Sequence, residues 1–490
     1  MRIGVVGAGI AGLASARVLG EAGHEVEVFD RTPDVGGVWS VTRRYPGLKT
    51  QNSKRVYGFA GLPMPTSYPD VPSGAQMQAY LQSYVEHFGF GDWIRLNTEV
   101  VTAQSTSRGW VLQVRDVHDE RVEAVDCDHL IVANGVFSAP NVPNYPGADD
   151  FKTAGGQLCH ASEFVDLDQA RGKRIVVVGY GKSACDIAEA VSDVAASTTV
   201  VVRRLLWKIP RKVRGLGNFE ALALTRFGEA GFGYLEPNGF ERFYNGRGRR
   251  LRDAAFDLMQ ALVTRQLRLR ELGLVPDGPF EDIAESTASL ATDGFYEKVA
   301  DRKIIVCRDI EITRLLGGPA VRLSSGEIVG AEVVLCATGF RQEVPFLAPD
   351  VTQQLTDANG DFRLYRQIVP SNVEALTFAG YNTSMLSSLG AEIGAVWTAA
   401  LLAGCLELPP PAERDKHIDT RLAWMRQRTR GHHAHGTVVA PFDIRNIDEM
   451  LRDLDTNIGP LTRARQWVIP ANPRSYRTIT ARRIRRPSTT

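Results

Sequence analysis

Two stretches of the chain repeat one pattern of hydrophobic and polar positions: a short apolar run, a glycine-rich loop and an alanine-containing segment with helical periodicity. The runs are Ile3 to Val6 and Arg174 to Val178, and another run follows each helix, at Val26 to Asp30 and at Thr199 to Arg203. Runs of about four or five apolar residues that alternate with helices are typical of parallel strands buried on both faces. The pattern therefore predicts two units of strand, helix and strand.

The remaining pattern divides the chain into four parts. Residues 1–150 contain the first unit, and residues 151–335 contain the second, interrupted at about 211–294 by an insertion that reads as mainly helical. Residues 336–410 are interpreted as a return to the first domain, and residues 411–490 as a polar, arginine-rich C-terminal extension. The sequence thus predicts an α/β fold with two Rossmann-like dinucleotide-binding domains, the second inserted into a discontinuous first one.

Each loop has the spacing GxGxxG, with alanine in third place in the second loop. The first glycine allows a tight turn, the second lets the backbone approach a pyrophosphate, and the third lets helix and strand pack closely, while the helix N-terminus faces the anion. Because both loops stand between a predicted strand and a helix, we interpret them as nucleotide-binding loops. The predicted contacts are Gly7, Gly9, Ile10, Ala11 and Gly12 in the first loop and Gly179, Gly181, Lys182, Ser183 and Ala184 in the second.

The residue that ends the second strand of each unit predicts which nucleotide binds there. Asp30 follows Gly7 by 23 positions, and a carboxylate there accepts hydrogen bonds from ribose hydroxyls but repels a 2′-phosphate, which favours FAD or NAD. Arg203 follows Gly179 by 24 positions and precedes Arg204, and a guanidinium pairs with a phosphate, which favours NADPH. The alternative for Asp30 is that it only starts the following turn. The alternative for Arg203 and Arg204 is that they are a solvated pair at the end of a strand. Two such sites in one chain indicate hydride transfer from NADPH to a flavin.

Composition narrows the class of protein further. A length of 490 residues suits two or three domains, and a formal net charge of +1 gives no global field that favours nucleic acid. No apolar run reaches the roughly 20 residues of a membrane span, and the N-terminal apolar run reads as a strand rather than a targeting segment. The six cysteines are widely spaced. We therefore expect no metal, no membrane or nucleic-acid partner, and a cytoplasmic protein.

Several further motifs resemble those of the flavin-containing monooxygenases and the related Baeyer–Villiger monooxygenases, over about residues 1–410. Phe164 ends a stretch that resembles the signature FxGxxxHxxx(Y/F), although Ala154 stands where the family has phenylalanine. Baeyer–Villiger enzymes usually have tryptophan at the position of Phe164, so phenylalanine favours the flavin-containing monooxygenase branch. The other matching segments are Gly37, Val38 and Trp39, the turn that contains Thr338 and Gly339, and the stretches Leu364 to Pro370 and Ala379 to Trp397.

The resemblance implies an N,N-dimethylaniline monooxygenase-like enzyme with FAD and NADPH as cofactors. Such an enzyme uses O2, by way of a C4a-(hydro)peroxyflavin, to oxygenate a small organic substrate, most often at nitrogen or sulfur. His160 and Phe164 would then be linker residues, with His160 coupling cofactor binding to the geometry of the domain connection. The resemblance also suggests a homodimer. It does not identify the substrate, because loops around such a site vary freely.

A polar stretch from Lys49 to Lys54 resembles a family segment in which an asparagine points toward the flavin. Counting back from Lys54, that position is Gln51, and it is Asn52 if the register shifts by one. A glutamine amide offers the same donors and acceptor on a longer arm. Gln51 and Asn52 are therefore the candidate catalytic residues, and the alternative is that they belong to a polar loop facing water.

Four other functions are alternatives to this one. A Baeyer–Villiger enzyme would convert a ketone to an ester or lactone, and an uncoupled oxidase would release H2O2 from the same cofactors. A flavin disulfide reductase needs a close cysteine pair, which the sequence lacks. A non-catalytic flavin-binding redox sensor would not need both nucleotide loops. Retention of both loops therefore argues against such a sensor.

Overall fold

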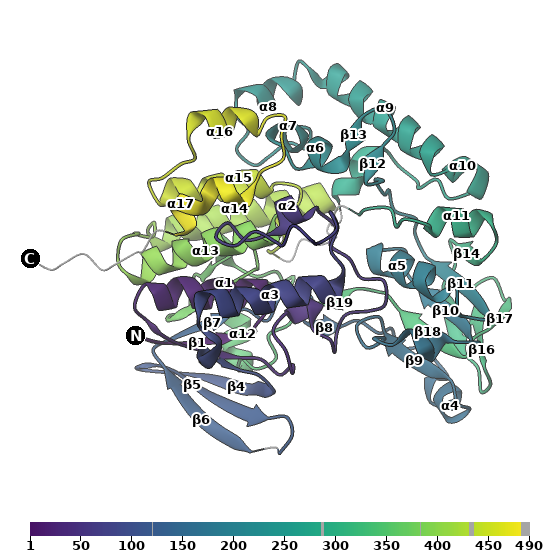
Figure 1. The fold of residues 1–490 in the computed structure, drawn as a ribbon, viewed down its shortest axis with the longest axis horizontal. Coiled ribbons are helices and arrows are strands. Elements are labelled where there is room, and N and C mark those ends of the chain that lie inside the picture. The colour runs from purple at the N-terminus through teal and green to yellow at the C-terminus, as the bar shows by residue number, and fades with distance from the viewer. Residues whose placement is uncertain (120, 286–288, 383, 431–435, 482–490) are drawn as a thin grey trace, which may run out of the picture.

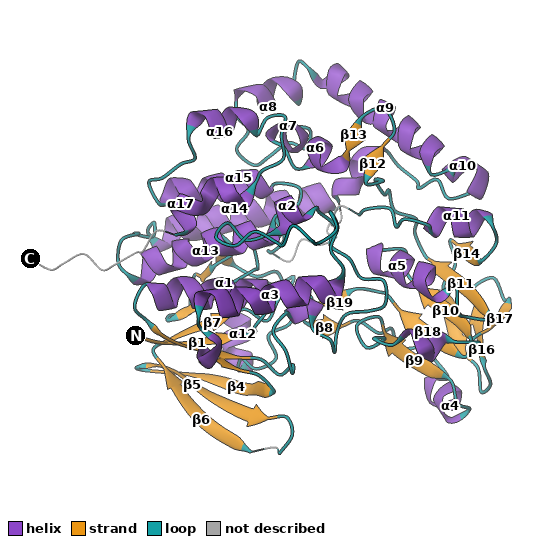
Figure 2. Ribbon diagram, in the orientation of Figure 1, coloured by secondary structure: helices purple, strands orange, loops and turns teal. Residues whose placement is uncertain are grey.

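The computed structural model describes residues 1–119, 121–285, 289–382, 384–430 and 436–481. It has two separate parallel sheets with helices packed around them and a layer of helices above (Figures 1 and 2). This arrangement confirms the predicted α/β class with two Rossmann-like units. Among the described helices, none is long and apolar enough to cross a bilayer.

The first sheet has five parallel strands, in the spatial order β22 (Leu376–Phe378), β7 (His129–Val132), β1 (Arg2–Val6), β2 (Glu25–Phe29) and β3 (Ile94–Arg95). β22 comes after the whole second sheet in the chain, so a returning segment completes the first sheet. α1 (Ile10–Glu21) packs against α13 (Ser387–Leu402), which also belongs to that returning segment. The elements beside this sheet are η1 (Gly37–Trp39), α2 (Lys54–Tyr57), α3 (Gly74–Phe88), η2 (Gly91–Trp93), the antiparallel strands β4 (Thr98–Thr106), β5 (Gly109–Asp116) and β6 (Val122–Cys127), and α12 (Pro349–Leu355).

The second sheet is also parallel, in the order β14 (Ile304–Arg308), β11 (Ser197–Val202), β10 (Arg174–Val178), β18 (Val333–Cys336) and β9 (Gln157–His160). β10 lies where the apolar pattern predicted it. The packed elements are α4 (Ala148–Thr153), η3 (Leu167–Ala170), α5 (Lys182–Val191), α11 (Phe295–Ala300) and the antiparallel strands β15 (Ile312–Leu315), β16 (Ala320–Leu323) and β17 (Ile328–Gly330).

The chain crosses between the two units twice, and the crossings run side by side. β8 (Ala139–Pro140) pairs antiparallel with β19 (Phe340–Arg341). A two-stranded connection of this kind restrains the angle between the units more than separate loops would.

The segment at about 211–294 is mainly helical. Its elements pack above the second sheet and extend toward the C-terminal helices (Figure 1). They are β12 (Lys212–Val213), β13 (Gly217–Asn218), α6 (Phe219–Ala223), α7 (Arg226–Ala230), α8 (Gly239–Tyr244), α9 (Arg249–Gln266), α10 (Leu269–Leu272) and η4 (Phe280–Ala284).

The C-terminal extension folds back onto the protein, up to the last described residues. Its helices α15 (Asp443–Asp453) and α17 (Arg477–Thr480) both contact α13. The arginine-rich end, Arg482 to Arg486, which we expected to be a mobile tail, lies outside the described residues. The other elements of the extension are α14 (Pro411–Thr429), α16 (Pro460–Arg465) and η5 (Pro473–Tyr476). The strands β20 (Leu364–Tyr365) and β21 (Val369–Pro370) belong to the returning segment before it.

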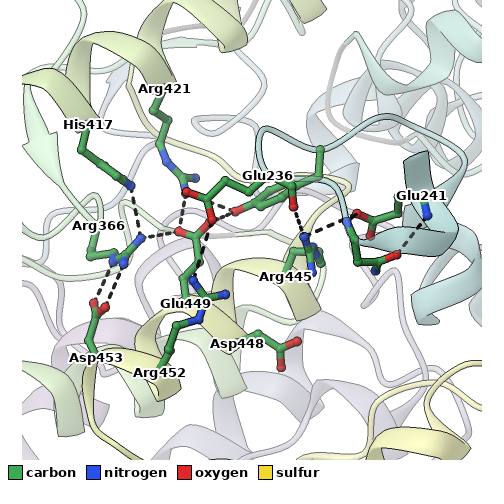
Figure 3. A network of polar contacts seen from close by, with 12 residues as sticks. Glu236, Glu241, Arg366, His417, Arg421, Arg445, Asp448, Glu449, Arg452 and Asp453 are labelled. Atoms are coloured by element: carbon green, nitrogen blue, oxygen red, sulfur yellow. Dashed lines mark hydrogen bonds and ion pairs between the residues drawn. The ribbon is translucent and has the colours of Figure 1, made fainter. Parts of the chain in front are cut away.

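A buried network of charges joins the extension to the rest of the chain (Figure 3). Glu449 of α15 lies at its centre and accepts hydrogen bonds from Arg366, Arg421 and Tyr234. Asp453 accepts two bonds from the Arg366 guanidinium, at 2.7 and 2.8 Å. These residues come from the turn between β20 and β21, from α14, from the insertion and from α15. The polar composition that marks the extension in sequence therefore serves internal contacts.

Candidate functional site

Gly7 and Gly12 lie where β1 passes into α1, and the local geometry requires glycine at both positions. Gly7 has a φ of +116°, and a Cβ there would lie 2.4 Å from the carbonyl oxygen of Ala133. A Cβ on Gly12 would lie 1.8 Å from the carbonyl oxygen of Gly7. Ile10 and Ala11 begin α1, which has no side-chain cap and no acidic residue in its first turn. The N–H groups of that turn therefore suit an anionic group such as a pyrophosphate.

At Gly9 the first loop lies against the segment Gly37 to Trp39, which the family resemblance also predicts to contact the flavin. A Cβ on Gly37 would lie 3.2 Å from the Cα of Gly9. Val38 is half-buried, and the buried indole of Trp39 packs edge-on against Tyr57, with ring centroids 6.0 Å apart. Two segments separated in sequence thus meet through backbone atoms alone, as a narrow cradle for an extended ligand requires.

The Asp30 carboxylate faces the same loop from the end of β2. Its Oδ2 accepts a hydrogen bond from the Ala8 N–H at 2.7 Å. Its Oδ1 accepts from the N–H and the hydroxyl of Thr32, at 2.9 and 2.8 Å. Because an ionised carboxylate accepts about four hydrogen bonds, there is capacity left for a ribose hydroxyl. The structure therefore places Asp30 beside the glycine loop, and the ribose contact itself stays a prediction.

The second glycine loop has the same construction. Gly179 has a φ of +119°, and a Cβ there would lie 2.6 Å from the carbonyl oxygen of Ala337. A Cβ on Gly181 would meet nothing within 4 Å, so the backbone is open on that side. Ala184 is buried in α5, and Ser183 is half-buried in its first turn, where no side chain caps the helix. This loop also fits an anion at the helix N-terminus.

The basic residues near this loop differ in their surroundings. The Lys182 ammonium bonds to Asp186 and lies 3.2 Å from the Thr292 hydroxyl, so its charge is already compensated. Arg203 and Arg204, in contrast, are exposed, and the Arg203 guanidinium lies 3.8 Å from the nearest oxygen of Glu311. An exposed guanidinium at the end of β11, held only by this long ion pair with Glu311, can pair with a phosphate.

Loss of the Arg203 guanidinium is expected to raise the KM for NADPH by roughly 10- to 100-fold, because a charged hydrogen bond contributes about 1.5–3 kcal/mol. The Arg203→Ala variant should change the KM for NADH by less than about threefold, since NADH has no 2′-phosphate. Steady-state kinetics with both coenzymes measure this split, and Arg108→Ala, at an exposed turn of another sheet, serves as the matched control. An equal rise for both coenzymes would contradict the assignment.

The backbone of the loop from Thr50 to Ser53 is held by two charged residues of the insertion. The Arg211 guanidinium donates to the carbonyl oxygens of Thr50 and Gln51, the first at 2.9 Å. The Glu220 carboxylate accepts hydrogen bonds from the N–H and, at 3.0 Å, from the hydroxyl of Ser53. Burial raises the pKa of Glu220, although the bonds from Ser53 oppose that shift. Neither Arg211 nor Glu220 was among the residues predicted from sequence, because each acts on a loop far away in the chain.

The two candidate catalytic side chains leave acceptors unused. Asn52 is buried, and its Nδ2 donates to the carbonyl oxygen of Met385, in the segment before α13. The side-chain oxygens of Gln51 and Asn52 are both buried, and neither has a hydrogen-bond partner among the described residues. A buried acceptor without a donor is unfavourable. Both oxygens therefore suit a ligand that presents N–H or O–H groups, and the geometry does not choose between the two residues.

His160 and its neighbours lie at the connection between the two units. The His160 ring contacts the carbonyl oxygen of Gly339 at 2.9 Å through Nε2 and the Ser162 hydroxyl at 2.8 Å through Nδ1. Burial lowers the pKa of His160. The Thr338 hydroxyl donates to the carbonyl oxygen of Asn141, which ties the two crossings together. A neutral ring held by both nitrogens suits the predicted linker role.

The remaining predicted linker residue, Phe164, is fully buried in the main core. Its ring contributes to packing near the connection rather than to a polar contact. Among the described residues, no group of three or more His, Cys, Asp or Glu side chains is arranged to hold a metal ion.

Comparison with known proteins gives one consistent result. A family model described as flavin-binding monooxygenase-like matches residues 1–242. Flavin-containing monooxygenase 1 of Homo sapiens is 26% identical over 438 residues, covering 86% of this chain and 77% of that protein. Dimethylaniline monooxygenase [N-oxide-forming] 4 of Mus musculus is 27% identical over 442 residues, covering 84% of this chain and 71% of that protein.

A solved structure of OTEMO in complex with FAD and NADP shares the fold, with a TM-score of 0.70 at 17% identity, covering 92% of this chain and 98% of that one. Two parallel sheets, with glycine loops after β1 and β10, are typical of a protein that binds two dinucleotides. The family model and the curated relatives support a place for the chain in the flavin-containing monooxygenase family. The predicted flavin agrees with the family model, which is described as flavin-binding, and the OTEMO structure contains both FAD and NADP.

Proposed function

We propose that the chain is an NADPH- and O2-dependent flavoprotein monooxygenase that oxygenates a small organic molecule at nitrogen or sulfur. The observation that supports this most is the opposite charge beside two glycine loops of the same construction. Asp30 contacts the first loop and suits the unphosphorylated ribose of FAD, whereas Arg203 stands exposed at the second and suits the 2′-phosphate of NADPH. When bound, the flavin would supply the redox chemistry, with NADPH as the hydride donor and O2 as the electron acceptor.

The chain's own contribution is to hold the cofactors, to exclude water and to place hydrogen-bond acceptors near the reacting groups. The loops of β1 and β10 hold two pyrophosphates at helix N-termini. Arg211 and Glu220 fix the loop that carries Gln51 and Asn52, so that the two amide oxygens stay in place without a side-chain donor. Preorganised polar groups of this kind stabilise charge as it develops, because they need no rearrangement during the reaction.

Substrate class is supported by the relatives and by Phe164. The mouse relative is named as N-oxide-forming, and Phe164 stands where Baeyer–Villiger enzymes usually have tryptophan. A panel of a tertiary amine, a thioether and a cyclic ketone, scored by substrate-stimulated NADPH consumption and by the mass of the product, tests the proposal. We expect an N-oxide or a sulfoxide. A lactone as the main product would make the enzyme a Baeyer–Villiger monooxygenase, and NADPH consumption that yields only H2O2 would make it an oxidase.

Removal of the Gln51 amide is expected to divert reducing equivalents to H2O2. In Gln51→Ala the unpaired buried acceptor is lost while the backbone contact to Arg211 remains, so the loop should keep its position. The ratio of H2O2 to oxygenated product should rise by about tenfold or more, in line with the loss of one preorganised polar group. Peroxide and product are quantified in the same reaction.

Two variants complete this experiment. Asn52→Ala removes the other orphan oxygen together with the bond to Met385, so it reports the same effect with a structural component added. Gln354→Ala, at an exposed helix position, is the matched control and should leave the ratio unchanged. An unchanged ratio in both Gln51→Ala and Asn52→Ala would remove this loop from the mechanism.

A further inference from the structure

The outer face of the insertion has an apolar patch that the described part of the chain leaves uncovered. It consists of Phe227 of α7, Phe240 and Phe243 of α8, and Leu461, Val468 and Ile469 in and after α16. The exposed fractions of these side chains run from 36% for Phe240 to 72% for Val468. Single exposed apolar residues are ordinary, but a cluster of this size indicates an interaction surface.

The patch is continuous across segments that are far apart in sequence. The Phe240 ring lies 6.1 Å from Phe227 and 5.2 Å from Trp467, measured between centroids. The Arg226 N–H donates to the carbonyl oxygen of Gln466, which joins the start of α7 to the segment after α16. Figure 1 shows α7, α8 and α16 next to one another at the top of the molecule. The insertion and the C-terminal segment therefore build one surface together.

The segments that carry this apolar patch are rich in arginine. Residues 237–252, which form α8 and the start of α9, contain five arginines and one glutamate, and that glutamate, Glu241, is buried and caps α8. Residues 459–469 contain two arginines and no acidic residue. Arg249 and Arg252 pair with Asp253, and Arg463 lies 3.4 Å from Asp448. The arginines without an ion pair in the described structure, which are exposed, are Arg242, Arg247, Arg250 and Arg465.

We propose that this face docks onto the surface of an anionic lipid bilayer and lies in its headgroup region without spanning it. Exposed aromatic and aliphatic side chains enter the acyl boundary, and the surrounding guanidinium groups pair with lipid phosphates. The expectation of no membrane partner rested on the lack of a spanning segment, and surface docking needs none. The inference does not depend on the proposed enzyme activity.

Charge favours a lipid surface over a second copy of the chain. In a twofold dimer the same patch occurs on both partners, so the arginines around it would face arginines. An anionic bilayer instead neutralises them, and each basic residue near such a surface adds to the binding. A soluble acidic protein would also be attracted, but it would not distinguish vesicles by their lipid charge.

Sedimentation of the flavin-loaded full-length protein with vesicles tests the proposal. Vesicles of equal parts phosphatidylglycerol and phosphatidylcholine should bind the protein at least about tenfold more tightly than vesicles of phosphatidylcholine alone, and added salt should weaken the binding. The triple variant Leu461→Ser, Val468→Ser, Ile469→Ser should lower the affinity for the anionic vesicles by at least about tenfold. The double variant Arg247→Glu, Arg250→Glu should abolish the preference for anionic lipid.

The matched control is the double variant Val122→Ser, Ile328→Ser. These two side chains are similarly exposed but lie in β6 and β17, away from the patch, so the control should bind vesicles as the parent protein does. Flavin content reports folding of every variant. The proposal is overturned if the parent protein fails to sediment with anionic vesicles, or if the control and the patch variants bind equally. It is also overturned if the patch variants change a dimer to a monomer without changing vesicle binding.

Discussion

Replacement of Gly12 with alanine is expected to yield a protein that does not retain FAD. The new Cβ would lie 1.8 Å from the carbonyl oxygen of Gly7, well inside van der Waals contact. The conflict is with backbone, so either α1 or the loop must move away. Because the loop would hold the pyrophosphate through backbone N–H groups, a shift of about 1 Å at this position removes several hydrogen bonds together. We expect the affinity for FAD to fall by at least about 100-fold.

The flavin absorbance near 450 nm relative to protein absorbance measures this loss directly. Gly318→Ala is the matched control, because a Cβ at Gly318 would meet nothing within 4 Å and the residue lies in a turn outside both nucleotide loops. Secondary structure measured by circular dichroism separates loss of the cofactor from loss of the fold. A yellow Gly12→Ala protein with ordinary FAD content would show that the first loop does not bind the flavin.

Features that depend on neighbours in sequence were predictable. The turns at Gly7 and Gly179 require positive φ, and Gly12 and Ala184 must be small because helix and strand pack within one unit. These requirements act over about a dozen residues, so they leave a readable spacing. The predicted strand Val26 to Asp30 is shifted by only one residue, to Glu25–Phe29, since buried valines mark it clearly.

Features that depend on distant contacts were not predictable. Arg211 contacts the carbonyl oxygen of Gln51 across 160 positions, and Ser53 contacts Glu220 across 167. Each would be an ordinary surface residue by composition, and no local spacing links it to the loop that it holds. The same holds for Asn52, whose amide reaches Met385 in a segment that packs against it only in the folded protein.

The high content of charged residues in the C-terminal extension is a poor guide to whether its side chains are exposed or buried. A high content of arginine and acidic residues is typical of solvated surface. Yet Arg421, Glu449 and Arg366 are all buried, because each meets a partner of opposite charge from another segment. Composition reports how many charges a segment has, and only the fold shows whether they are paired. The folded extension is therefore a structural part of the enzyme, which leads to the second large expected effect.

Replacement of Glu449 with glutamine is expected to lower the free energy of unfolding of this region by about 3–5 kcal/mol, the usual cost of removing one partner from a buried ion pair. Arg421 is almost fully buried and would be left beside a neutral amide. Burial opposes ionisation of Glu449, but the charges of Arg421 and Arg366 outweigh it and lower its pKa. Hydrogen exchange in α14 and α15, together with the thermal midpoint of the flavin-loaded protein, measures the loss.

The pH dependence of the free energy of unfolding tests independently whether the buried charge of Glu449 causes this loss. Because the folded-state pKa of Glu449 lies below the unfolded value of about 4.3, its contribution is full above that pH and is lost as pH falls through the folded pKa. The difference between parent and Glu449→Gln should therefore be constant near neutral pH and shrink below about pH 4. Glu271→Gln, in a fully exposed pair with Arg268, should show no measurable change at any pH. If Glu271→Gln destabilised the protein as much as Glu449→Gln does, burial of the ion pair would not be the cause of the large effect at Glu449.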